Sequence, residues 1–217
     1  EGTFLDLDAF ERGTSVYLPD RVIPMLPKKL SNGICSLNEG VDRLVMGCRM
    51  EIDDTGSVIN SEIFEGVINS KHRMTYDDVN KILNGDESLI KEYEDIYEML
   101  LNANSLSKIL NEMRIKRGAF MFETPEAKLI LNEKGYVKDI VLRSRRDAEC
   151  LIEEFMLAAN ECVAETMTWL DVPFIYRVHE EPKEDKINKL LLMVNNFGYS
   201  YKIKNQRIHQ KQYVSLP

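Results

Sequence analysis

Two stretches of the chain show the alternation of apolar and polar residues that is typical of β-hairpins. In residues 42–76, alternating or continuous apolar positions flank the sequence DDTG at 53–56, which is a turn signal. Residues 126–144 alternate most cleanly in YVKDIVL and contain a second turn signal, NEKG, at 132–135. The pattern therefore predicts two antiparallel hairpins.

Other stretches repeat their apolar residues at three- and four-residue steps, which is the period of an amphipathic helix. One helix is expected from Thr75, an N-cap residue type, to Gly85. Others are expected over 88–116 and over 182–198, where a proline stands near the start and a glycine at the end. The longest helix is expected over 148–170. Its apolar stripe consists of Ala148, Leu151, Ile152, Phe155, Met156, Ala159, Cys162, Val163, Met167 and Leu170.

Short elements complete the expected fold. Residues 6–13 predict one or two helical turns closed by a glycine, and residues 15–18 an extended piece. A proline-bounded turn with a short helix follows at 24–33. Residues 171–179 predict a buried strand and residues 199–204 a last strand or sheet edge. Together the elements predict one domain over residues 1–217, of mixed α/β (α+β) class, with a mixed β-sheet and hairpins packed against long helices.

Composition excludes several classes of protein. The 217 residues are 44% hydrophobic and 29% charged, which is an ordinary globular composition. No apolar run approaches the roughly 20 residues of a membrane helix. The first residues have neither the basic nor the apolar region of a signal peptide, and the absence of an initiator Met predicts a segment of a longer chain. The four cysteines form no CxxC pair, so we expect reduced thiols, no zinc site and a cytoplasmic protein.

Charge argues against a large nucleic-acid surface, because the net charge is −8 and such surfaces are usually basic. The charge is unevenly distributed, however. Basic clusters occur in NEMRIKRG at 111–118 and in LRSRRD at 142–147. The sequence therefore leaves a local basic groove on an acidic protein as an alternative.

The acidic pairs of the sequence do not predict a metal site. The two acids of DLD at 6–8 point about 200° apart on a helix, given about 100° per residue. The pair at 53–54 sits in a turn and the pair at 77–78 opens a helix, and Asp is favoured in both places for local reasons. No HExxH, GxSxG, GxGxxG or P-loop motif is present. We therefore expect no catalytic residue and no metal ligand within this chain.

Aromatic residues near basic residues are the remaining candidates for chemistry. Tyr17 stands close to Arg21, Tyr76 follows SKHRM, and Phe122 follows RIKRG. Rings that stack on bases, with Lys and Arg along the phosphates, are the means by which proteins hold single-stranded RNA. The alternative is that these rings belong to the core.

Five ordered blocks resemble one family. They are ERGTSVYLPDRVIPMLPKKLSNGICSLNEGVDRL, SKHRMTYDDVN, RGAFMFETPEAKLIL, IEEFMLAANECVAE and PFIYRVHEEPKEDKINKL. They resemble the catalytic RNB domain of the ribonuclease II / ribonuclease R family, and RGTSVY favours the ribonuclease R branch. The likeness covers essentially the whole chain.

The resemblance implies a processive 3′-to-5′ exoribonuclease that uses Mg²⁺ and releases nucleoside monophosphates. Its RNB domain lies between OB-fold domains, which are not in this segment. Tyr17 matches the ring at the bottom of the RNA channel, and Phe122 matches a second stacking ring. Glu153 matches a polar contact to the terminal nucleotides, and Tyr76 a tyrosine that handles RNA. The partner implied is the 3′ end of single-stranded RNA, with no DNA and no membrane.

Two parts of the family pattern are missing from this sequence. The metal-binding run, an Asp followed by a D-x-D-D group, lies upstream of GTSVY, and the SPIRRY-like run with a phosphate-binding arginine lies downstream of the last residue. The magnesium ligands are therefore expected outside this segment, which is expected to be inactive alone. The alternative function is a catalytically inert RNB-like domain that only binds RNA or a protein partner.

Overall fold

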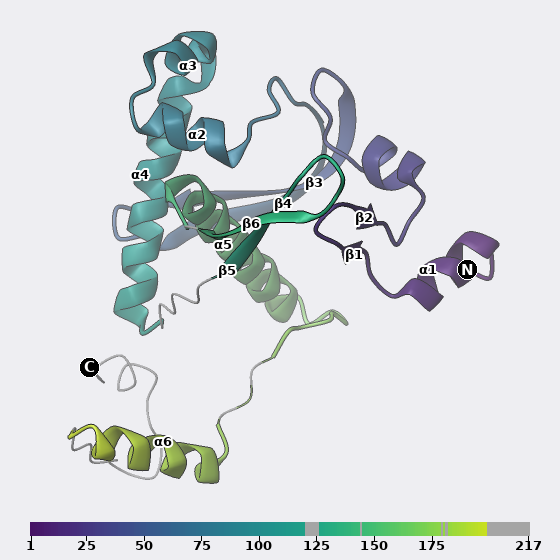
Figure 1. Ribbon diagram of the computed structural model, residues 1–217. Coiled ribbons are helices and arrows are strands. Elements are labelled where there is room, and N and C mark those ends of the chain that lie inside the picture. Colours follow the sequence, from purple (N-terminus) through teal and green to yellow (C-terminus); the bar gives the residue numbers. More distant parts are fainter. Residues whose placement is uncertain (120–125, 144, 179, 181, 199–217) are drawn as a thin grey trace.

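The computed structural model describes residues 1–119, 126–143, 145–178, 180 and 182–198. It combines helices with short antiparallel sheets (Figure 1), which confirms the expected α+β class. The elements are α1 (Phe4–Arg12), β1 (Val16–Tyr17), β2 (Val22–Ile23), a π-helical turn η1 (Lys29–Ile34), β3 (Asp42–Ile52), β4 (Val58–Asn69), α2 (Tyr76–Leu83), α3 (Glu87–Glu92), α4 (Glu94–Arg117), β5 (Glu126–Leu131), β6 (Val137–Arg143), α5 (Asp147–Trp169) and α6 (Glu184–Asn196).

The described strands form three two-stranded antiparallel sheets, β1–β2, β3–β4 and β5–β6. The β3–β4 register runs from Asp42 opposite Asn69 to Ile52 opposite Val58, with an irregularity just before Ile52. Both predicted hairpins are confirmed, and so are their turns. A two-stranded ribbon is marginally stable by itself, so each hairpin needs packing from other parts of the molecule.

The turn of the first hairpin shows how local chemistry fixes its shape. One carboxylate oxygen of Asp53 accepts hydrogen bonds from the backbone N–H groups of Thr55 and Ser57, each at 2.9 Å. The hydroxyl of Thr55 also donates to it, and these bonds lower the pKa of Asp53. Gly56 has φ +87°, and a Cβ there would lie 2.9 Å from Cβ of Met113 on α4. Only glycine therefore fits this close approach of turn and helix.

The hydrophobic core lies where α2 meets α4 and the beginning of α5, and α3 packs against it. Figure 1 shows α2 and α3 beside one end of α4. Partly buried aromatic and aliphatic side chains from α3 and from the first turns of α4 surround this core. Its buried members are Val79, Ile82, Leu100 and Ala148.

The single helix expected over 88–116 is wrong, because α3 ends and α4 begins at Tyr93 (φ −112°, ψ 35°). The Tyr93 ring packs edge-to-face against His72, with 5.3 Å between ring centroids. His72 Nε2 in turn lies 2.9 Å from Oδ2 of Asp95 in the first turn of α4. The segment that follows β4 therefore contacts the residue at the break and the first turn of α4, and helical periodicity alone does not predict these contacts.

The buried strand expected over 171–179 is also wrong. Residues 172–178 have no regular structure, no described strand pairs with them, and Ile175 is 95% exposed. An apolar run without a neighbouring ladder has no partner for its backbone groups. The strand expected at 199–204 lies outside the described residues. In the part of the chain that the structure describes, no helix is both long and apolar enough to cross a membrane.

The apolar stripe of α5 is buried only in part. Leu151 and Cys162 are buried, whereas about half of Ile152 and Met156 is exposed. Glu154, which is not in the stripe, is 3% exposed. The face of α5 that enters the core is therefore rotated from the face that hydrophobicity alone predicts.

A side chain from α2 caps the start of α5. The N-cap residue of α5, Arg146, makes no side-chain capping bond. Instead Oδ1 of the buried Asn80 accepts a hydrogen bond from the N–H of Ala148 at 3.1 Å. The Asn80 amide donates to the carbonyl of Tyr76 at 2.7 Å and to Glu149 Oε2 at 3.0 Å. One amide thus satisfies an N–H that has no partner within α5 and joins the two helices.

We expect Asn80→Ala to lower the free energy of unfolding by about 2–3 kcal/mol, because it leaves the buried N–H of Ala148 without its acceptor. Urea denaturation of the variant measures this loss. Asn102→Ala, at an exposed position of α4, is the matched control and should change stability by less than about 0.5 kcal/mol. Equal effects of the two substitutions would contradict the capping role.

Candidate nucleic-acid interface

Tyr17 presents an exposed ring on a fixed backbone. It is the last residue of β1, pairs with Val22 of β2, and is 78% exposed. The N–H of Leu18 donates to the carbonyl of Arg21 at 2.8 Å, which closes the turn between the two strands. The Ser15 hydroxyl accepts from the N–H of Met25 at 3.0 Å and ties the segment after β2 back to β1. The ring is thus available to a flat ligand with little backbone freedom left to lose.

Tyr76 opens α2 and is 43% exposed. The N-cap Thr75 accepts from the N–H of Asp78 at 3.2 Å and donates its hydroxyl to Oδ2 of Asp78 at 2.6 Å. This reciprocal cap confirms the helix start expected at Thr75. It fixes the backbone of Tyr76 while the ring remains half exposed.

Glu153 lies between two arginines. Its Oε2 accepts from Nη2 of Arg145 at 2.8 Å, and its Oε1 lies 3.6 Å from Nη2 of Arg114. The carboxylate is about one-third exposed, so a ligand can reach it. Any contact to RNA through Glu153 would be made by a carboxylate whose position is set by these guanidinium groups. Phe122, the fourth residue expected at this interface, lies outside the described residues.

Sequence reasoning missed the buried ion pair behind Glu153. Glu154 receives two bonds from Arg114, Nε to Oε2 at 3.1 Å and Nη2 to Oε1 at 2.5 Å. The amide of Asn111 donates to Oε1 at 2.8 Å. The pair joins α4 to α5. The sequence contained one indication that Glu154 is buried. It follows Leu151 by three residues and therefore lies on the same face of the helix.

Four arginines of the two basic clusters, Arg114, Arg117, Arg145 and Arg146, are paired with acids. Arg117 makes a bidentate contact to Glu161, at 2.8 and 2.6 Å. Arg146 donates to Asp77 at 2.6 Å and to Glu149 at 2.9 Å, and the bond from Arg146 lowers the pKa of Asp77. In these pairs the positive charge of each arginine is neutralised by an acid, and the pairs join neighbouring helices. The clusters therefore do not form a simple basic groove.

The acidic pairs that the sequence contains serve local structure. Asp6 accepts from the N–H of Gly2, and Asp8 pairs with Arg12 one turn later. Among the described residues, no three or more His, Cys, Asp or Glu side chains lie close enough together to hold a metal ion. Magnesium requires several converging oxygen ligands, so the described residues do not fit it.

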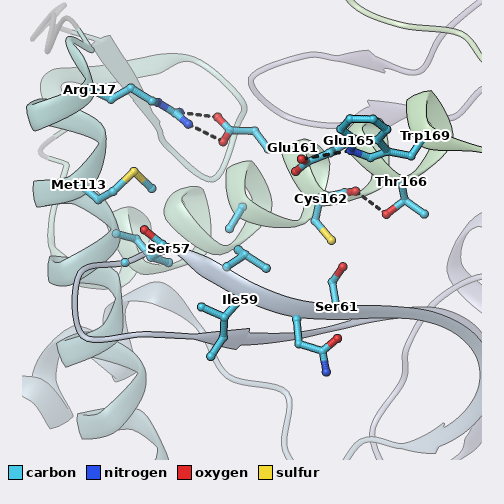
Figure 2. Close-up of a pocket in the computed structure, with 15 residues that line it drawn as sticks. Ser57, Ile59, Ser61, Met113, Arg117, Glu161, Cys162, Glu165, Thr166 and Trp169 are labelled. Carbon is cyan, nitrogen blue, oxygen red and sulfur yellow. Dashed lines mark hydrogen bonds and ion pairs between the residues drawn. The ribbon is translucent and has the colours of Figure 1, made fainter.

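A cavity of about 550 Å³ lies between the start of β4, α4 and α5 (Figure 2). The bidentate pair of Arg117 and Glu161 stands at one side of it, and Trp169 lies at the other with its Nε1 3.4 Å from Glu165. The described residues that are expected to contact RNA do not line this cavity. Their proposed base contacts and the cavity are therefore separate features.

We expect Glu154→Ala to destabilise the fold by about 3 kcal/mol, since it leaves a largely buried Arg114 without its closest carboxylate. Chemical denaturation measures the loss. The control is Glu112→Ala, whose carboxylate is mostly exposed and 3.8 Å from Lys116, and it should cost less than about 0.5 kcal/mol. If both variants unfold at the same denaturant concentration, the buried pair does not hold α4 to α5.

The chain is similar to known proteins in sequence and in fold. The family described as RNB domain matches residues 1–215. The chain is similar to ribonuclease R of Thermotoga maritima, with 52% identity over 210 residues, 96% of this chain and 29% of that protein. It therefore spans less than a third of the length of that relative.

Solved structures of RNase R are similar to this chain in fold. Mycoplasma genitalium RNase R in complex with ribose methylated single-stranded RNA matches with a TM-score of 0.86 and 31% identity, over 100% of this chain and 34% of that one. The same enzyme in complex with double-stranded RNA matches with a TM-score of 0.87 and 31% identity, over 100% of this chain and 38% of that one.

Proposed function

Because the chain belongs to the RNB-domain family, we propose that it forms the base-contacting part of a processive 3′-to-5′ exoribonuclease. The complete enzyme hydrolyses RNA to nucleoside monophosphates, and its partner is the 3′ end of single-stranded RNA. The relatives solved with RNA support an RNA ligand. We place the protein in the cytoplasm, in keeping with four cysteines that are all free thiols.

The observation that carries this proposal is the exposed ring of Tyr17 on a backbone held by the β1–β2 pairing. A ring of this kind stacks on any base, because every base has a π-face, and contributes roughly 1–3 kcal/mol per base. A stacking ring near the 3′ end grips the last nucleotides without reading their sequence. That suits an enzyme that must advance along any RNA.

Tyr76, Phe122 and Glu153 complete the proposed RNA contacts. Tyr76 offers a half-exposed ring at a capped helix start, and Phe122 offers the second stacking ring that the family pattern implies. Glu153 contacts the terminal nucleotides through a carboxylate positioned by Arg145. Phosphate contacts from residues beyond this chain supply the remaining affinity, since arginines of both basic clusters already pair with acids.

Magnesium is the metal that we propose for the complete enzyme. The resemblance to the family implies ligands outside this segment, and we propose them there; the described residues offer no fitting ligand set. The second candidate function, an inert RNB-like domain that only binds RNA or a protein partner, rests on the same lack of ligands. The first function predicts that bound RNA is degraded, and the second predicts that bound RNA stays intact.

A 5′-labelled single strand separates the two functions. The complete protein with magnesium should shorten it from the 3′ end to a short labelled limit product, and a chelator should stop the reaction. A circular RNA of the same sequence has no 3′ end and should stay intact. Linear RNA that is bound but never shortened would support the inert domain, and cleavage of the circle would contradict exonucleolytic action.

Residues 1–217 alone should release no mononucleotides from labelled RNA in magnesium, because catalysis needs several carboxylates around the ions. Thin-layer separation of the products against a mock preparation measures this. Processive release above the mock level would place the catalytic machinery inside this chain.

In the complete protein, we expect Tyr17→Ala to lengthen the limit product by one nucleotide or more, since short RNAs lose roughly 1–3 kcal/mol of stacking. The melting temperature should stay unchanged, because the ring is exposed. Tyr136→Ala, a similarly exposed ring beside the second hairpin turn, is the control and should leave the product length unchanged. An unchanged product with a lowered melting temperature would make Tyr17 a packing residue.

A further inference from the structure

Two cysteines that are far apart in the sequence meet in the fold. Cys48 lies in β3 and Cys162 in α5, 114 positions later, and their Sγ atoms are 3.5 Å apart. Both are free thiols. Cys162 is buried and Cys48 is partly buried. Neither belongs to a CxxC motif, so the pair exists only because α5 packs against β3.

We propose that Cys48 and Cys162 are an oxidisable pair that forms a disulfide and cross-links β3 to α5. A disulfide holds its sulfurs about 2.05 Å apart, so the two Sγ atoms need to approach by about 1.5 Å. Rotation of the side chains and a small shift of the hairpin on the helix can supply that distance. Within the described part of the chain, Cys35 and Cys150 make no such contact with a thiol.

A small oxidant can reach the pair through the cavity between β4, α4 and α5. Cys162 is one of its lining residues. Figure 2 shows its sulfur pointing from α5 toward the hairpin, on the side of Ser61. A cavity of about 550 Å³ is ample for hydrogen peroxide. Cys162 is therefore the thiol that an oxidant in the cavity meets, and Cys48 is the thiol that resolves the intermediate.

The chemistry proceeds in two steps. The Cys162 thiol first loses its proton, and the thiolate attacks one peroxide oxygen. The O–O bond breaks, a sulfenic acid forms, and the departing hydroxide takes up the released proton to become water. The Cys48 thiolate then attacks the sulfenic sulfur, the S–O bond breaks, and the departing hydroxide takes up the proton that the Cys48 thiol released, which gives a second water. Two thiols are oxidised and one peroxide is reduced. Burial raises the pKa of the Cys48 thiol, so a smaller fraction of it is thiolate at neutral pH than for an exposed cysteine.

The cross-link would close a long loop, because its two ends are 114 positions apart. Such a link restricts the unfolded chain strongly and stabilises the native state. It would also fix the hairpin on the helix that carries Glu153 and Glu154. Oxidation should therefore raise the midpoint of thermal unfolding by about 10 °C.

Peptide mapping tests the proposal directly. The complete, natively folded protein is treated with hydrogen peroxide, its remaining thiols are blocked with a maleimide, and it is digested without reductant. Mass spectrometry should find the peptides of Cys48 and Cys162 joined, and a dithiol reductant should separate them. Cys35→Ser and Cys150→Ser should retain the cross-link. Oxidised protein that lacks it, or that links Cys35 or Cys150 instead, would overturn the proposal.

Single substitutions separate the roles of the two thiols. In Cys48→Ser, peroxide should leave Cys162 as a sulfenic acid that dimedone traps, and the melting temperature should not rise. Cys162→Ser should leave Cys48 free. If Cys162→Ser does not fold, Cys48→Ser and the unsubstituted protein still decide the matter. A rise of the melting temperature in Cys48→Ser equal to that of the unsubstituted protein would overturn the cross-link as its cause.

Discussion

The capping of α5 by Asn80 is the contact on which much of the described fold depends. The oxygen of this buried amide accepts from the N–H of Ala148, and its nitrogen bonds to α2 and to Glu149. Because α5 contacts α2, α4, β3 and β4, the place where it begins sets the position of everything along it. Glu154 and Cys162 reach their partners on α4 and β3 from that starting point.

Three arginines of the domain join its helices through ion pairs. Arg114 pairs with Glu154 inside the fold, while Arg117 and Arg146 pair with acids at its surface. The RNA contact that we propose is compatible with an acidic domain, because exposed rings such as Tyr17 can stack on bases without a basic groove. The ion pairs that join α4 to α5 are thus separate from the proposed base contact, which is on β1.

Local chemistry made much of the fold predictable. The hairpin turns at 53–56 and 132–135 and the helix start at Thr75 were expected from their residues, and each is stabilised by bonds within a few positions. The strand expected over 171–179 failed because its apolar residues have no adjacent ladder among the described strands. Of the expected site residues, Tyr17 and Tyr76 have exposed rings, and nothing in the sequence indicated the arginines around Glu153.

The sequence by itself determined most of the helices, both long hairpins with their turns, the local cap at Thr75 and the family, because these depend on residue types a few positions apart and on ordered blocks. Only the tertiary structure decided which face of α5 is buried, why α3 and α4 separate at Tyr93, and which thiols meet. The physical reason is the separation, along the sequence, of the residues that make contact. Turns and local caps such as that of Thr75 close over three or four residues. The Asn80 cap of α5 spans 68 positions and the contact between Cys48 and Cys162 spans 114, so both exist only after the helices pack.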